Sequence, residues 1–136
     1  MSDLNIHHTQ MIGRDGTPIR LSYDQDGDVL DVYFGDNVPA IGIPLTEDII
    51  LRLDEAGERP VSLILNNISA LTEQTEFGPR SFPLEQLDEL PRALRQLVVR
   101  LVTSAPVNQF LKLSHLQASA TKRVPITVVS AAPVAV

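Results

Sequence analysis

The chain has 136 residues, a net charge of −6, 43% hydrophobic and 21% charged residues, and no cysteine. This length and balance suit one globular domain with its own core, so we expect a single domain over residues 1–136. The lack of cysteine excludes disulfide scaffolds, zinc–thiolate sites and cysteine nucleophiles.

Alternating apolar residues predict a series of β-strands in the first half of the chain. The predicted strands lie near residues 5–12, 19–23, 30–34, 41–45, 49–53 and 61–65. Asp26-Gly27 marks a hairpin after the second of them. Pro39 and Pro44 suit an edge position for the fourth, because proline cannot donate a backbone hydrogen bond. The short connections favour an antiparallel β-meander of five or more strands.

Residues 19–71 carry a series of short sequence blocks in a fixed order. Tyr23-Asp24 precedes a turn, Asp28-Val29-Leu30 follows it, and the acidic turn at residues 54–57 precedes the apolar residues 63–65. In this order and spacing the chain resembles the YuzE-like family, the domain of unknown function numbered 2283. The resemblance implies a compact β-sheet module with no established activity. It also implies an antitoxin-like role, since members often lie beside genes for small RNase-like toxins.

A leucine repeat in the remaining part, residues 77–136, predicts an amphipathic helix between Leu84 and Thr103. Its leucines recur at spacings of three and four residues, which is typical of one helix face. They are Leu87, Leu90, Leu94, Leu97 and Leu101. Pro91 predicts either a kink or a second helix that starts there. We expect an α+β fold in which this helix covers the sheet; in the alternative, the leucines form the interface of a dimer.

Two further segments of the C-terminal half, residues 107–113 and 124–129, are predicted to be extended. They are expected to add strands to the sheet of the same subunit or of a neighbouring one. Together with the leucine repeat they offer more apolar surface than one small sheet covers. We therefore expect a homodimer built from the C-terminal half.

Acidic residues of the first half are candidates for a binding surface. Residues 1–76 carry 14 acidic and 4 basic residues, a net of −10, and residues 77–136 carry 3 acidic and 7 basic residues, a net of +4. The acidic half is expected to repel nucleic acid and to attract a basic protein partner. The candidate partner-binding residues are Asp24, Asp28, Asp31, Asp36, Glu47 and Asp48. Reversing the charges of Asp28 and Asp36 is expected to leave the fold nearly intact, because exposed charges contribute little to stability.

No sequence pattern indicates catalysis or a cofactor. The chain has no nucleophile elbow, phosphate loop or zinc-protease motif. Asp24, Asp26 and Asp28 have the alternate spacing that opens a calcium loop, but the rest of such a loop is missing. We expect a non-catalytic interaction or regulatory module with no cofactor or metal. The alternatives are a structural homo-oligomer, a weak metal-binding protein that uses the Asp24–Asp28 loop, and acids that serve only solubility.

The sequence also bears on the cellular location. Residues 1–10 are polar and lack the apolar centre of a signal peptide. No apolar stretch approaches the roughly 18 residues that a membrane span needs. We therefore expect a soluble, cytoplasmic protein without a membrane partner.

Overall fold

Strands make up most of the regular structure. The structure, a computed structural model, describes residues 6–56, 58–76, 78–117, 119–121 and 123–130. The elements, with η for 3-10 helices, are β1 (Ile6–Ile12), β2 (Pro18–Asp24), β3 (Val29–Phe34), β4 (Ala40–Pro44), β5 (Ile49–Asp54), β6 (Pro60–Asn66), α1 (Ile68–Leu71), β7 (Gln74–Thr75), β8 (Gly78–Pro79), β9 (Ser81–Pro83), η2 (Glu85–Glu89), α2 (Arg92–Val102), η3 (Val107–Gln109), β10 (Leu111–Gln117) and β11 (Arg123–Val129).

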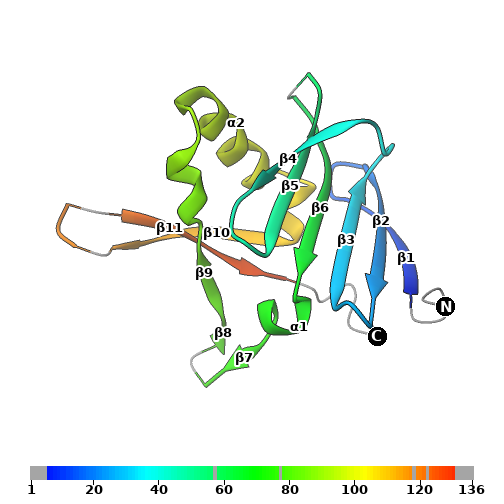
Figure 1. Ribbon diagram of the computed structural model, residues 1–136, viewed down its shortest axis with the longest axis horizontal. Coiled ribbons are helices and arrows are strands. Elements are labelled where there is room, and N and C mark those ends of the chain that lie inside the picture. Colours follow the sequence, from blue (N-terminus) through cyan, green and yellow to red (C-terminus); the bar gives the residue numbers. More distant parts are fainter. Residues whose placement is uncertain (1–5, 57, 77, 118, 122, 131–136) are drawn as a thin grey trace.

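Six strands form the main sheet, which is antiparallel and has the order β1-β2-β3-β6-β5-β4 (Figure 1). All six predicted strands are confirmed, and β4 lies at an edge as its prolines predicted. The prediction of a single meander is wrong, because β3 pairs with β6. The chain crosses from β3 to the far edge of the sheet before β4 begins. The apolar run of β6 suits a central strand. The proline-flanked β4 is confined to an edge, so β3 is left to pair with β6.

Strand alternation gives the main sheet one apolar face. In β3 and β5 every second residue is buried, and the cross-strand register aligns these residues on the same side. The buried residues of this face include Ile19, Leu21, Leu30, Val32, Phe34, Ile43, Ile49, Leu51, Leu53, Leu63 and Leu65. Burial of each such side chain contributes about 1.5–3 kcal/mol to stability.

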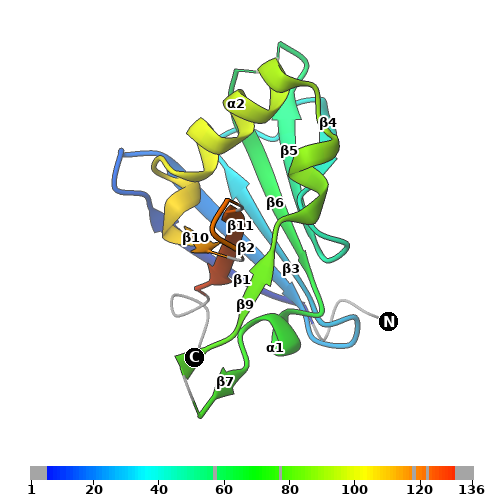
Figure 2. The ribbon, with the colours of Figure 1, turned by 90° about the vertical axis from the view of Figure 1, so that its left-hand side faces the viewer.

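The C-terminal half covers this apolar face. Figure 2 shows α2 and a second sheet, of order β10-β11-β9, on the same side of the main sheet. Phe110, which follows η3, is fully buried, and its ring centroid lies 6.1 Å from that of Phe34. The predicted α+β fold is thus confirmed in part: the fold is mostly antiparallel sheet with few helices, and α2, of 11 residues, shares the cover with a second sheet.

The predicted C-terminal helix is interrupted at proline. The 3-10 helix η2 ends at Glu89, Leu90 is extended, and α2 begins at Arg92, directly after Pro91. Proline disfavours helical backbone in the residue before it, so the prediction of a second helix starting at Pro91 is confirmed. Among the described helices, none is long and apolar enough to cross a membrane.

The leucine repeat lies mostly at the margin of the core. Leu87 is buried, whereas the other four leucines are only partly buried against the core. The residues of α2 that are fully buried are Val98 and Val102. The helix therefore presents its valines to the core, and the leucines flank that contact on the solvent side.

The predicted extended segments form a separate layer. Val107–Gln109 is a 3-10 turn, so the predicted segment at residues 107–113 is extended only from Leu111 onward. β10 pairs with β11, and β11 also pairs with β9; neither strand pairs with the main sheet, which was the prediction. The short connection between them explains this, because strands that are close in sequence pair at a low entropic cost.

Candidate functional site

Two turns rich in acidic residues meet at one end of the main sheet. Antiparallel pairing places the β2–β3 turn, the β4–β5 turn and the start of α1 at this end (Figure 1). A backbone hydrogen bond of 2.8 Å from the Asn66 N–H to the Asp48 carbonyl oxygen links the end of β6 to the β4–β5 turn. We name the acids of the two turns the acidic end: Asp24, Asp26, Asp28, Glu47 and Asp48. Four of the six predicted partner-binding residues are brought together here.

The other two predicted residues lie elsewhere. Asp36 follows β3 at the opposite end of the sheet, where Arg59 Nη2 donates to its carbonyl oxygen over 3.4 Å. Asp31 lies within β3, on the face that points away from the core, between Ser22 of β2 and Ile64 of β6. The acidic stretch is divided because β3 carries the chain from one end of the sheet to the other.

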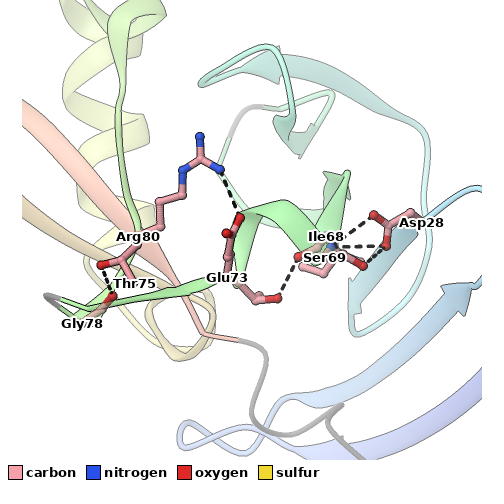
Figure 3. A network of polar contacts seen from close by, with 8 residues as sticks. Asp28, Ile68, Ser69, Glu73, Thr75, Gly78 and Arg80 are labelled. Carbon is pink, nitrogen blue, oxygen red and sulfur yellow. Dashed lines mark hydrogen bonds and ion pairs between the residues drawn. The ribbon is translucent and has the colours of Figure 1, made fainter.

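Asp28 connects the β2–β3 turn to α1 (Figure 3). Its carboxylate accepts a hydrogen bond of 2.7 Å from Ser69 Oγ and bonds of 3.2 Å from the Ser69 N–H, and Tyr23 Oη donates to it over 3.4 Å. Its carbonyl oxygen accepts from the Ile68 N–H over 3.0 Å. Its φ of 55° is left-handed, a conformation that aspartate tolerates better than most residues. Asp28 is therefore a structural residue, and these contacts argue against the expectation that reversing its charge spares the fold.

Two more carboxylates of the acidic end hold its turns in place. Asp24 Oδ1 accepts from the Asp26 and Gly27 N–H groups over 3.1 and 3.2 Å, which closes the β2–β3 turn. Asp48 Oδ1 accepts from Asn67 Nδ2 over 2.9 Å. The side chains of Asp26 and Glu47 are the exposed members of the acidic end.

The contacts of the Asp24–Asp28 loop do not favour a metal site. The carboxylate of Asp24 accepts from the backbone of its own turn, whereas that of Asp28 accepts from Ser69. The two carboxylates thus accept hydrogen bonds from different donors. Within the described part of the chain, no group of three or more His, Asp or Glu side chains is arranged to hold a metal ion.

Sequence reasoning missed the partners of Asp28 and Asp48. Ser69 lies 41 residues after Asp28, and Asn67 lies 19 residues after Asp48, so no local pattern joins them. One signal was present in the residue types: Asp28 and Asn67 both adopt positive φ, and aspartate and asparagine are the residues most often found there.

Asp31 carries a half-buried carboxyl on the face away from the core. Burial raises the pKa of Asp31 above its usual value, the positive charge of Arg52 opposes this, and the negative charge of Asp24 adds to it. Arg52 Nη1 donates to Ser62 Oγ over 2.9 Å. The ionised form of Asp31 is therefore disfavoured in the folded protein.

We expect Asp31→Asn to stabilise the protein at neutral pH. The raised pKa means that the folded state holds more protons than the unfolded state between the two pKa values. The contribution of Asp31 to the free energy of unfolding is therefore complete at pH values below its unfolded-state pKa. It is lost as the pH rises through the folded-state pKa of this group. Urea midpoints measured from acid to neutral pH should show the variant gaining over wild type as pH rises. The exposed Asp36→Asn serves as control, and an equal gain there would contradict the assignment.

Comparison with known proteins gives no match, since no family model, curated protein or solved structure is similar to the chain. The resemblance of residues 19–71 to the YuzE-like family stays a prediction from its sequence blocks.

Proposed function

We propose that this protein is a cytoplasmic, non-catalytic interaction module that captures a basic protein partner through its acidic end. The observation that carries the proposal is that the β2–β3 and β4–β5 turns place five acids at one end of the main sheet. No basic residue lies between Leu21 and Leu51, the stretch that supplies them. Like charges gathered on one surface steer an oppositely charged partner and raise its association rate.

The hydrogen bonds of the acidic end support this role. Asp24, Asp28 and Asp48 fix the turns, and Asp26 and Glu47 are thereby presented to solvent on a defined backbone. A surface that is already ordered loses little conformational entropy when it binds. The same charge repels phosphate groups, so the partner is a protein and not a nucleic acid.

An antitoxin-like role extends the proposal and rests on the resemblance to the YuzE-like family. An RNA-cleaving toxin needs a basic surface to hold its substrate. The acidic end would cover that surface and exclude RNA from it.

Changing the charge of the acidic end is expected to slow capture of the partner. The test variant, Asp26→Asn with Glu47→Lys, keeps a turn-forming residue before Gly27. The control, Glu55→Gln with Glu58→Lys, makes the same change in net charge at the opposite end of the sheet. The partner used in the test is a protein that the wild type retains from cell lysate. At low salt, this partner should associate with the test variant about tenfold more slowly than with the wild type.

The difference should shrink with salt, as the Debye length falls from about 10 Å at 0.1 M to about 3 Å at 1 M. If both variants slow association equally, net charge and not the acidic end steers the partner. If neither variant slows it at any salt concentration, the acids serve only solubility.

A further inference from the structure

Strand β1 forms an open edge of the main sheet, at the right in Figure 1. No described strand pairs with its outer side. An edge strand presents unpaired N–H and C=O groups, and proteins usually protect such edges with proline, lysine, a bulge or a short strand. β4, at the opposite edge, has this protection in Pro44. β1 lacks it, because its seven residues include no proline and no charged residue and pair with β2 without a bulge.

The hydrogen bonds of the β1–β2 hairpin show which backbone groups of β1 point outward. The Gly13 N–H donates to the Thr17 carbonyl oxygen over 2.7 Å, so these two opposed residues form a hydrogen-bonded pair. Hydrogen-bonded and non-hydrogen-bonded pairs alternate along an antiparallel ladder. The backbone groups of every second residue of β1 therefore point away from β2, toward the open edge. These residues are Ile6, His8, Gln10 and Ile12.

The sequence of β1 is nearly symmetric about Thr9, so the strand complements a second copy of itself. In an antiparallel pair centred on Thr9, Ile6 of one copy lies opposite Ile12 of the other. In the same register, His8 lies opposite Gln10. Each outward-pointing residue thus meets another, and the two exchange both backbone hydrogen bonds. Isoleucine faces isoleucine, threonine faces threonine, and no like charges are opposed, which favours the pairing.

This pairing covers the most exposed large hydrophobic residue in the described part of the chain. Ile12 is 67% exposed. Its side chain lies on the face of the main sheet away from the core, because the preceding residue, Met11, packs against the core. Directly opposed residues of an antiparallel pair have Cβ atoms about 4.5–5.5 Å apart on the same face. Ile6 of the second copy would therefore shield Ile12 from water.

A groove of about 620 Å³ borders β1 and fits a side chain of the second copy. Its lining includes His7, Leu21 and Tyr23. The rings of His7 and Tyr23 stack with their centroids 6.3 Å apart. In the register centred on Thr9, Met11 of the second copy lies opposite His7 and on the same face. A methionine side chain is flexible and packs favourably beside aromatic rings, so it suits this groove.

We propose that β1 is the interface of a two-fold homodimer, in which the two β1 strands pair antiparallel about Thr9 and join the two main sheets into one. The contact is the same for both copies, so the assembly closes at two. The two-fold axis is perpendicular to the joined sheet, so both covering layers lie on the same side of it. The interface belongs to the first half of the chain and not to the C-terminal half. It uses no residue of the acidic end.

Sedimentation velocity of the full chain tests the interface, and the wild type should be a dimer at high micromolar concentration. Gln10→Pro removes an N–H that points away from β2, a position at which edge strands tolerate proline. It should raise the dissociation constant at least about tenfold, because each copy loses a hydrogen bond to the other.

The matched control for this variant is Gly42→Pro on β4. The Leu45 N–H donates to the opposed Ile49 carbonyl oxygen over 2.8 Å, so by the same alternation the Gly42 N–H points away from β5. This control should remain a dimer, and circular dichroism should show that both variants keep the fold. A monomeric wild type, or equal weakening by the two variants, would overturn the proposal.

A second pair of variants changes only side chains. Ile12→Lys and Ile41→Lys each place one charge at an exposed position, on opposite edges of the main sheet. Ile12→Lys should weaken the dimer about tenfold, because its charge would lie against Ile6 of the other copy. Ile41→Lys should leave the dimer unchanged. A dimer that Ile12→Lys leaves intact would contradict the interface.

Cysteine cross-linking tests the register of the two strands. The chain has no cysteine, so Thr9→Cys introduces a single thiol. The two Thr9 positions form a non-hydrogen-bonded pair with Cα atoms about 4.5 Å apart, which is within the range for a disulfide. Thr9→Cys should therefore form an intermolecular disulfide on mild oxidation, whereas His7→Cys, on the same face but opposite Met11, should not. Equal cross-linking of both would overturn the register centred on Thr9.

Discussion

A chain that ends at Gly78 is expected not to fold cooperatively. It retains the main sheet but loses the layer that covers its apolar face. The buried residues lost are Leu84, Leu87, Val98, Val102, Val107, Phe110, Leu111 and Val129. Each contributes about 1.5–3 kcal/mol by burial, so together they contribute about 12–24 kcal/mol, which is comparable to or larger than the 5–15 kcal/mol by which a domain of this kind is stable.

Urea unfolding followed by circular dichroism checks this expectation, with the full chain under the same conditions as control. The full chain should show one sigmoidal transition, and residues 1–78 should show none. Binding of a hydrophobic dye to the fragment should report the uncovered face. A soluble fragment with its own cooperative transition would mean that the main sheet is stable without its cover.

The sequence predicted the strands well because burial on one face imposes an alternation that is local in the chain. Leu30, Val32 and Phe34 of β3 show this pattern, and so do Ile49, Leu51 and Leu53 of β5. The strand order was not predictable in the same way. The pairing of β3 with β6 joins residues that are distant in sequence, such as Leu30 and Leu65, and no local pattern specifies which non-adjacent strand fills a free edge.

The helix shows a second limit of sequence patterns. The leucine repeat predicted the position of the helix and Pro91 its start, but the buried residues are Val98 and Val102. A leucine stripe and the valines beside it lie within one turn of each other on a helix. Which of them is buried depends on the angle at which the helix meets the second sheet and the core, and this angle is a tertiary property.

The acidic end shows a third limit, since charge alone does not separate structural acids from exposed ones. Asp28 and Glu47 look alike in the sequence. In the fold, the first accepts hydrogen bonds from Ser69 and Tyr23, and the second is exposed. The difference depends on α1, which reaches Asp28 only after the chain has passed through four more strands.

Replacing Asp28 is expected to destabilise the protein, in an order set by its backbone. Asp28→Ala loses the hydrogen bonds to Ser69 and Tyr23, and hydrogen bonds to a charged acceptor contribute about 1.5–3 kcal/mol. It also places at φ 55° a residue that has a Cβ atom but no polar side chain. Asp28→Gly loses the same bonds but tolerates this φ, so its loss should be about 1 kcal/mol smaller. Asp28→Asn keeps an acceptor and tolerates this φ, and should be the mildest. Urea unfolding of the three variants, with Asp36→Ala as an exposed control, gives the order.

A double-mutant cycle of Asp28→Gly and Ser69→Ala separates the contact from other effects of these changes. Because Ser69 Oγ donates to this carboxylate over 2.7 Å, the two losses should be less than additive, with a coupling energy of about 0.5–3 kcal/mol. Additive losses would show that the contact does not stabilise α1 against the turn. The result also decides how the acidic end is studied. If Asp28 stabilises the turn, its replacement impairs folding and capture together, and the exposed Glu47 is the better position at which to measure capture.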